Sequence, residues 1–265
     1  PFTLSSEKEQ IIRKSGILDY FPKNESLKDV GGMDNLKEWL NKRQLAYDKE
    51  ARDWGLKEPK GLLLLGVPGC GKSLIAKSIA SSWNMPLLRL DVGKVFQGIV
   101  GSSEDNIRKA IATAEAVAPC VLWIDEIEKG LSGVQSSGAT DGGVTSRIFS
   151  TILTWMQEKT APVFVVATAN NINQLPPELL RKGRFDEFFF VDLPSQKEKE
   201  NIFSIHLQKN RQNVSSFALD ILAQKAEGFN GAEIEECIKE AMFTAYVESQ
   251  ETNIAPKLQM IHILD

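Results

Sequence analysis

The residues best suited to chemistry lie in one glycine-rich stretch, GLLLLGVPGCGKS, at 61–73. Between an apolar run and a helical pattern, this stretch fits the spacing G-x-x-x-x-G-K-[ST] through Gly66, Gly71, Lys72 and Ser73. Glycines let backbone N–H groups turn inward around phosphate oxygens, and the N-terminus of a following helix adds a favourable dipole. We expect Lys72 to reach the β and γ phosphates of a nucleotide and the Ser73 hydroxyl to bind Mg²⁺. The alternative is a glycine-rich turn with an exposed lysine.

Two acids follow the apolar run 120–124. Asp125 and Glu126 come directly after it, and an α/β sheet presents its ligand-binding residues at the carboxyl ends of its strands. Asp125 would hold Mg²⁺ through water, and Glu126 would polarise the water that attacks a γ-phosphate. Paired acids elsewhere are usually a solvated strand edge, but the phosphate loop upstream favours a metal ligand and a base. Glu128 and Lys129 are expected to be ordinary surface residues.

The three cysteines, Cys70, Cys120 and Cys237, form no spaced pair. An odd, sparse set of cysteines is typical of a reducing compartment and not of a disulfide framework. Cys70 lies inside the phosphate loop beside a predicted helix N-terminus, which would favour its thiolate. A redox switch is therefore one hypothesis for Cys70, and a small residue tolerated in the loop is the other.

Short apolar runs alternate with helical patterns after Lys60. Continuous apolar character suits strands that are covered on both faces, and the five runs are 61–65, 86–90, 120–124, 163–167 and 188–191. Strands that alternate with helices of this length imply βαβ units. The sequence therefore predicts an α/β fold with a five-stranded parallel sheet, in which the phosphate loop follows the first of these strands.

Only helical patterns follow residue 195. In the clearest of them, FNGAEIEECIKEAMFTAYVES, one face carries Ile234, Ile238, Ala241, Met242 and Ala245. Asn230 and Glu233 have capping-box spacing at the start of this pattern. We therefore expect a small all-helical domain at 195–265, after an α/β domain at 26–194 and an N-terminal helical or linker segment at 1–25. The glycine- and serine-rich stretch 130–146 predicts a mobile loop.

Composition is that of a globular protein, with 265 residues, 42% hydrophobic, 25% charged and a net charge of −4. This acidic balance and the lack of a basic–aromatic stripe disfavour a nucleic-acid motor or loader. No apolar run reaches the roughly 18 residues that a membrane span needs, and no signal-like segment opens the chain. The chain begins at Pro1, which predicts a piece of something longer.

With these residues in view, the chain closely resembles the AAA family of ATPases, in the group with the second region of homology, over residues 26–248. The resemblance implies the P-loop NTPase fold with a C-terminal helical lid, bound Mg-ATP, and hydrolysis of ATP to ADP and phosphate. The stretch VGGMDNLKEWLNKR is similar to a poorly assigned group of cyanobacteria and plastids. That likeness implies the cytoplasm or the plastid stroma and leaves the substrate open.

Further family motifs imply how a nucleotide is held. SLKDVGGMDNLKEWL matches a segment whose Asp29 and Gly31 positions lie against adenine. GFNGAEI matches the lid motif, whose Gly231 and Ala232 approach the nucleotide. His206 matches a position at the base or ribose; without the resemblance it would be a buried, satisfied histidine. Together, the implied nucleotide-binding residues are Asp29, Gly31, Pro68, Gly69, Cys70, Gly71, Lys72, Ser73, Leu74, His206, Gly231 and Ala232.

Two more motifs concern the reaction. VVATAN ends in Asn170, which matches the polar sensor residue that orients the attacking water. LPPELLRKGRFD carries Arg181 and Arg184, which match the family's arginine fingers and project toward the γ-phosphate of a neighbouring subunit. An arginine supplied in trans is worth about 10³–10⁵ in rate in comparable systems. The resemblance therefore implies a ring, a hexamer, that remodels a protein partner, with Arg147 as a third interface arginine.

The chain departs from many relatives in the loop that would line a central pore. Those relatives carry an aromatic residue in a K-Y-V-G-like context, whereas GIVG here places Ile99 at that position and Phe96 off register. Either Ile99 grips a polypeptide substrate weakly by apolar contact, or this protein does not thread polypeptide at all. A connecting loop with no substrate role is the other alternative. A slow nucleotide-gated scaffold or regulator also stays open beside remodelling, since Glu126, Asn170 and the arginines argue against an inactive enzyme but not against a slow one.

Overall fold

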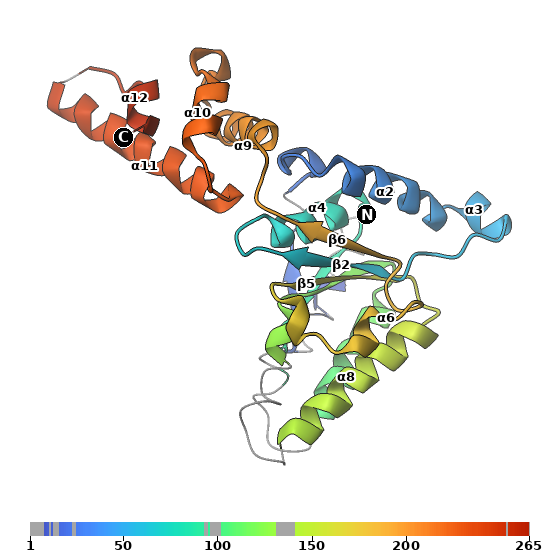
Figure 1. Ribbon diagram of the computed structural model, residues 1–265. Coiled ribbons are helices and arrows are strands. Elements are labelled where there is room, and N and C mark those ends of the chain that lie inside the picture. The colour runs from blue at the N-terminus through green and yellow to red at the C-terminus, as the bar shows by residue number, and fades with distance from the viewer. Residues whose placement is uncertain are drawn as a thin grey trace. The chain divides into compact units, whose positions relative to one another are not determined.

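The computed structural model describes residues 8–10, 12, 16–22, 25–92, 95, 102–130, 141–252 and 254–264 (Figure 1). The chain divides into two compact units. The first unit comprises Pro1–Leu27, Asn35–Gly66 and Lys72–Phe190. The second unit comprises Lys28–Asp34, Val67–Gly71 and Val191–Asp265. The phosphate loop therefore belongs mainly to the second unit, whereas Lys72, which follows it, belongs to the first.

A six-stranded sheet in the order β1-β3-β4-β5-β2-β6 forms the centre of the first unit. Its strands are β1 (Leu18–Phe21), β2 (Gly61–Gly66), β3 (Leu87–Leu90), β4 (Cys120–Ile124), β5 (Val163–Ala169) and β6 (Glu187–Val191). The four strands β3, β4, β5 and β2 pair in parallel. In Figure 1, β6 runs in the same direction as its neighbour β2. The predicted α/β fold with a parallel sheet is confirmed.

Strand β1 corrects the predicted number of strands from five to six. Leu18–Phe21 pairs antiparallel with β3, with Leu18 opposite Leu90. It lies within residues 1–25, for which the sequence predicts a helical or linker segment. Of its four residues only Leu18 is buried. An edge strand has one neighbour and covers little of the core, so its apolar pattern is too short and too mixed to recognise.

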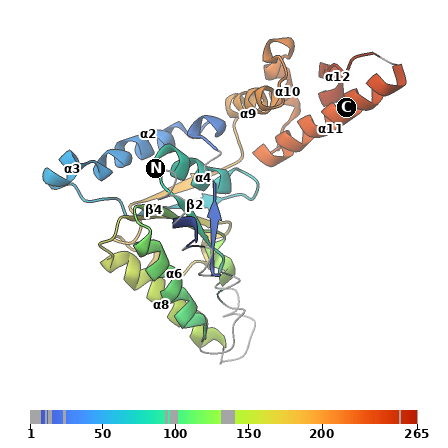
Figure 2. The same ribbon diagram turned by 180° about the vertical axis from the view of Figure 1, so that it is seen from behind.

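Strands β2, β4 and β5 are buried along their whole length. Helices cover both faces of the sheet, which explains the continuous apolar runs. Helices α6 (Ser102–Ala116) and α8 (Asp141–Glu158) run side by side on one face, and α4 (Lys72–Ser82) lies on the other (Figures 1 and 2). Helices α2 (Asp34–Gln44) and α3 (Lys49–Asp53) precede β2 along the chain. Parallel strands thus bring the residues that follow their carboxyl ends to one edge of the sheet.

Helix α8 corrects the extent of the loop predicted at 130–146. Residues 141–146 form the first turns of this helix, and residues 131–140 lie outside the described residues, as does Ile99. The glycines in these first turns conceal the helix start because glycine has a low helix propensity. The buried side chains of Ile148 and Ile152, further along α8, pack into the core and hold the helix on the sheet.

The C-terminal part of the second unit consists of helices, as predicted. They are α9 (Gln196–Lys209), α10 (Leu219–Lys225), α11 (Gly231–Thr252) and α12 (Met260–Leu264). Their own core includes Phe203, Leu207, Ile234 and Ile238. The predicted capping box at the start of α11 is confirmed: Asn230 N donates to Glu233 Oε2 at 2.7 Å, and Glu233 N donates to Asn230 Oδ1 at 3.0 Å. Across the described ranges, no helix is long and apolar enough to cross a membrane.

Candidate functional site

The predicted phosphate loop joins the end of β2 to the first turn of α4. Gly71 has a φ of +85°, a left-handed conformation that glycine adopts without strain. Lys72 is the first residue of α4, is 7% exposed, and donates from Nζ to Gly66 O at 2.7 Å. Ser73 follows in the same turn and is half-buried. A cation and a hydroxyl therefore stand at the N-terminus of an 11-residue helix, an arrangement that suits phosphate binding.

Within the second unit, the start of α11 lies against the same loop. A Cβ on Gly69 would be 2.6 Å from Asn230 Nδ2, so a larger residue at 69 requires a shift. Ala232 N donates to Gly69 O at 3.3 Å. Gly231 and Ala232, which the family motif predicts near the nucleotide, are thus next to residues 67–71 of the phosphate loop.

The remaining loop residues differ in exposure. Pro68 is exposed, Leu74 is half-buried, and Cys70 is 8% exposed. Cys70 Sγ lies 3.9 Å from Pro68 O. Reactive, redox-sensing thiols are accessible to solvent as a rule. The burial of Cys70 therefore favours a small residue tolerated in the loop over a redox switch.

Asp125, directly after β4, is held by two side chains that the sequence does not reveal. Its Oδ1 accepts a hydrogen bond from Thr168 Oγ1 at 2.7 Å, and its Oδ2 accepts one from Arg89 Nη2 at 3.3 Å. Thr168 is on β5 and 1% exposed. Arg89 is on β3, and its guanidinium lies 5.0 Å from the Trp123 ring centroid. Since β3 and β5 flank β4, the neighbours of Asp125 come from 36 residues before it and 43 residues after it.

Glu126 has a left-handed backbone conformation with a φ of +48°. Such a conformation costs a non-glycine residue about 1–3 kcal/mol and persists where the surroundings hold it. Glu126 N donates to Thr168 Oγ1 at 2.9 Å, so one buried hydroxyl contacts both acids. Glu126 Oε1 in turn accepts a hydrogen bond from Asn170 Nδ2 at 3.1 Å. The predicted base and the predicted water-orienting amide are thus in direct contact at the ends of β4 and β5.

Glu128 and Lys129 both contact this cluster. Glu128 is 4% exposed, and its Oε1 accepts a hydrogen bond from Asn170 N at 2.8 Å. The prediction that it is a surface residue is wrong, because the short helix η3 (Ile127–Gly130) returns the chain to the strand ends. Lys129 is exposed, but its Nζ pairs with Glu126, and this hydrogen-bonded contact raises the pKa of Lys129.

The two predicted finger residues lie in one turn, residues 181–186, which we call the arginine loop. It follows the short helix η5 (Pro177–Leu180), and Gly183 within it has a φ of +95°. Arg181 is exposed and Arg184 is half-buried. Arg184 Nη1 is buried and has no hydrogen-bond partner among the residues that the structure describes. Arg184 Nη1 is therefore a donor that no described residue satisfies in this position.

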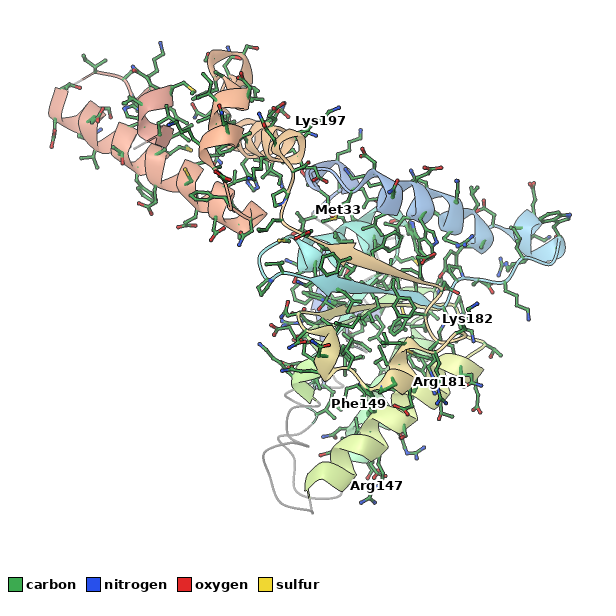
Figure 3. All side chains as sticks on the ribbon, in the orientation of Figure 1. Met33, Arg147, Phe149, Arg181, Lys182 and Lys197 are labelled. Atoms are coloured by element: carbon green, nitrogen blue, oxygen red, sulfur yellow. The ribbon has the colours of Figure 1, made fainter. Side chains whose placement is uncertain are left out.

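Arg147, the third candidate, belongs to a different place in the first unit. Figure 3 shows it well separated from Arg181 and Lys182. It lies in the first half of α8 and pairs through Nε with Glu104 Oε1 at 3.5 Å. The structure therefore does not bring Arg147 into the arginine loop.

In the second unit, Asp29 and Gly31 lie against α9. Lys209 Nζ pairs with Asp29 Oδ1 at 3.2 Å, and a Cβ on Gly31 would be 2.6 Å from Ile202 Cγ1. His206 stands between Ile202 and Lys209 along α9, and its burial lowers its pKa. The residues predicted to surround a base and ribose are thus gathered on one helix face, where His206 is neutral near pH 7.

The acids and the loop hydroxyl fit one kind of metal site. The described residues contain no group of three or more His, Cys, Asp or Glu side chains that could enclose a metal ion. In nucleotide sites, Mg²⁺ takes one or two protein oxygens and completes its shell with phosphates and water. Ser73 offers a hydroxyl, and Asp125 offers a carboxylate that Thr168 and Arg89 orient. This donor set fits Mg²⁺ carried on a nucleotide.

Comparison with known proteins points the same way. Residues 62–193 match the model of the "ATPase family associated with various cellular activities (AAA)". The chain is 52% identical over 246 residues to the "Uncharacterized AAA domain-containing protein ycf46" of Guillardia theta, covering 92% of this chain and 48% of that protein. The protein of the same name from Pyropia yezoensis is 52% identical over 249 residues, covering 92% of this chain and 50% of that protein.

A third relative is more distant: the "Cell division cycle protein 48 homolog" of Archaeoglobus fulgidus is 34% identical over 230 residues, covering 85% of this chain and 31% of that protein. The chain spans about half the length of the ycf46 relatives it matches. The fold, the glycine-rich loop and these relatives agree with the resemblance that the motifs carry. The chain belongs to the AAA family of ATPases.

Proposed function

We propose that this chain binds Mg-ATP and hydrolyses it to ADP and phosphate, with an ATPase domain at 26–194 and a lid at 195–265. The observation that carries the proposal is the 3.1 Å hydrogen bond between Asn170 Nδ2 and Glu126 Oε1. It joins a carboxylate that accepts a proton to an amide that orients a water, beside the carboxylate of Asp125. A water that Asn170 orients would therefore lie close to Glu126, and a general base must be within hydrogen-bonding distance of the water that it activates.

Each residue has a separate task in the proposed reaction. Lys72 binds the β and γ phosphates, and Ser73 and Asp125 hold Mg²⁺, which when bound neutralises phosphate charge. Glu126 takes a proton from the attacking water as the water oxygen bonds to the γ-phosphorus, while Asn170 fixes that water. The bond from the γ-phosphorus to the bridging oxygen breaks, and ADP leaves with the electron pair.

We further propose that Arg184, with Arg181, completes the site of a neighbouring subunit in a ring, a hexamer. The support is that the Arg184 guanidinium is half-buried and its Nη1 has no hydrogen-bond partner in the described part of the chain. Arginine cannot lose its charge, and its planar fork matches phosphate oxygens. A buried, unpaired donor is costly, and a turn of the side chain toward the γ-phosphate of a neighbouring subunit would relieve that cost.

A mixing experiment tests the shared site. Lys72→Ala subunits keep their arginines but lose their phosphate loop, whereas Arg184→Ala subunits keep the loop but lose the finger. Each variant alone should hydrolyse ATP poorly. A mixture should recover part of the wild-type phosphate release, because Lys72→Ala subunits supply fingers to intact loops. If no mixing ratio restores activity, the shared site is contradicted.

The proposed output of hydrolysis is the remodelling of a protein partner. The Glu126→Gln variant, loaded with ATP, is the bait for that partner, and the ADP-loaded variant is the control. Binding to DNA or RNA that weakens steeply with salt would point instead to a nucleic-acid function. We place the protein in the cytoplasm or the plastid stroma, since an odd, sparse set of three cysteines is typical of a reducing compartment.

A second candidate, a slow nucleotide-gated scaffold, is favoured by one contact. Lys129 Nζ pairs with Glu126, the proposed base, and this contact occupies part of the carboxylate that would accept the proton. Lys129→Met should therefore raise turnover if the pair slows hydrolysis. Equal turnover in the variant and the wild type would remove this support for a slow scaffold.

A further inference from the structure

The start of β2 is tied to the arginine loop by contacts that the proposed mechanism does not use. Lys60 Nζ donates to Gly183 O at 2.9 Å and to Gln157 O at 2.8 Å. Asp186 Oδ2 accepts from Lys60 N at 2.6 Å and from Gly61 N at 2.9 Å. Asp186 N also donates to Gly61 O at 2.8 Å. We call this set of hydrogen bonds the Lys60–Asp186 clamp.

The clamp fixes the backbone on both sides of Arg184. Gly183 precedes Arg184 in a left-handed conformation with a φ of +95°, and Lys60 holds its carbonyl. Asp186 is anchored on the other side by its backbone and its carboxylate. Lys182, which directly precedes Gly183 in the arginine loop, is labelled in Figure 3. Because the backbone is already fixed, Arg184 has less backbone freedom to lose when it binds.

The same strand connects the clamp to the phosphate loop. All six residues of β2 are buried, and the strand lies between β5 and β6. Lys60 directly precedes β2, and Gly66 at its other end accepts the hydrogen bond from Lys72 Nζ. A strand that is hydrogen-bonded on both sides is a stiff connection. The two ends of β2 thus hold the nucleotide loop of a subunit and the arginine loop of the same subunit.

We propose that Lys60 and Asp186 are positioning residues for the arginine that a subunit offers to its neighbour, and that they are dispensable for ATP binding by the subunit's own phosphate loop. This inference rests on the proposed role of Arg184 in trans. The physical reason is that an arginine supplied across an interface stabilises the γ-phosphate only when its guanidinium is correctly positioned. A displacement of about 1 Å can lower a rate by about 10²-fold.

The test separates a defect in the donor subunit from one in the acceptor subunit. In the donor arm, Lys60→Met is added to Lys72→Ala subunits, which are mixed with Arg184→Ala subunits. We expect the recovered phosphate release to fall about tenfold. In the acceptor arm, Lys60→Met is added to the Arg184→Ala subunits and mixed with Lys72→Ala subunits, and recovery should stay within about twofold.

Further variants serve as controls. Lys57→Met, at an exposed lysine three positions earlier, should leave both arms unchanged. Asp186→Ala removes the other half of the clamp and should lower only the donor arm. Lys60→Arg keeps the charge and the donors, and should retain most of the recovery. The binding of a fluorescent ATP analogue to Lys60→Met protein should match the wild type.

The outcomes are distinct. An unchanged donor arm overturns the clamp proposal, and so does an equal loss in both arms, since Lys60 would then act on its own site or on folding. If the parent pair of Lys72→Ala and Arg184→Ala subunits shows no recovery, the shared site itself fails, and this inference fails with it. A loss confined to the donor arm supports both.

Discussion

Thr168→Val tests how one buried hydroxyl holds the two acids. Valine keeps the branched shape of threonine and suits strand β5. It lacks the Oγ1 that accepts from Glu126 N at 2.9 Å and donates to Asp125 Oδ1 at 2.7 Å. Thr168 is 1% exposed, so water does not replace the missing hydroxyl.

The contacts set the size of the effect. A buried N–H left without an acceptor costs about 1–3 kcal/mol, and we expect the variant to lose about 2 kcal/mol of unfolding free energy. Glu126 is already in a left-handed conformation with a φ of +48°, so its backbone should relax when that hydrogen bond is lost. Its carboxylate would then leave Asn170. We expect turnover to fall about 10- to 100-fold, which corresponds to about 1.4–2.7 kcal/mol in the activation barrier.

Three measurements check this prediction: steady-state phosphate release, denaturant unfolding and the binding of a fluorescent ATP analogue. Nucleotide affinity should change less than turnover, since Thr168 contacts Asp125 but does not belong to the phosphate loop. Thr168→Ser is the matched control, because it keeps the hydroxyl and should recover most of the turnover. Wild-type turnover in Thr168→Val, or a Thr168→Ser variant as slow as Thr168→Val, would refute the reasoning.

The other predictions concern the base, the second unit and the half-buried Lys159. Glu126→Gln should still bind ATP but lose turnover, and unchanged phosphate release would remove Glu126 as the base. Gly31→Ala places a Cβ 2.6 Å from Ile202 Cγ1 and should cost about 1–3 kcal/mol of unfolding free energy. Adding Ile202→Ala should recover part of this loss. Equal losses with and without Ile202→Ala would contradict the clash. Burial lowers the pKa of Lys159 from 10.5 to about 8, so the unfolded chain binds more protons between these values and stability rises with pH across that window. Lys159→Met removes this titration, and it also removes the hydrogen bond from Lys159 Nζ to Val163 O at 2.6 Å. The urea stability of the wild type should therefore rise relative to that of the variant between pH 8 and 10.5, and a difference that stays constant with pH would contradict the titration.

The sequence by itself determined the features that depend on neighbouring residues. The glycine spacing before Lys72 is a local pattern, and so is the apolar run before Asp125. Parallel strands that are buried on both faces must be continuously apolar, so β2, β4 and β5 and the edge to which they point were predictable. The capping box at Asn230 and Glu233 was predictable because both of its hydrogen bonds span three residues.

Only the tertiary structure decided which residues hold the acids and the arginines in place. Thr168, Arg89 and Lys60 act on residues 43, 36 and 123 positions away in the chain, across neighbouring strands and loops. No local pattern marks such partners, because a threonine in a strand or a lysine before one suits many environments. The burial of Glu128 and the strand at Leu18–Phe21 were missed for the same physical reason: each depends on which distant segment packs beside it.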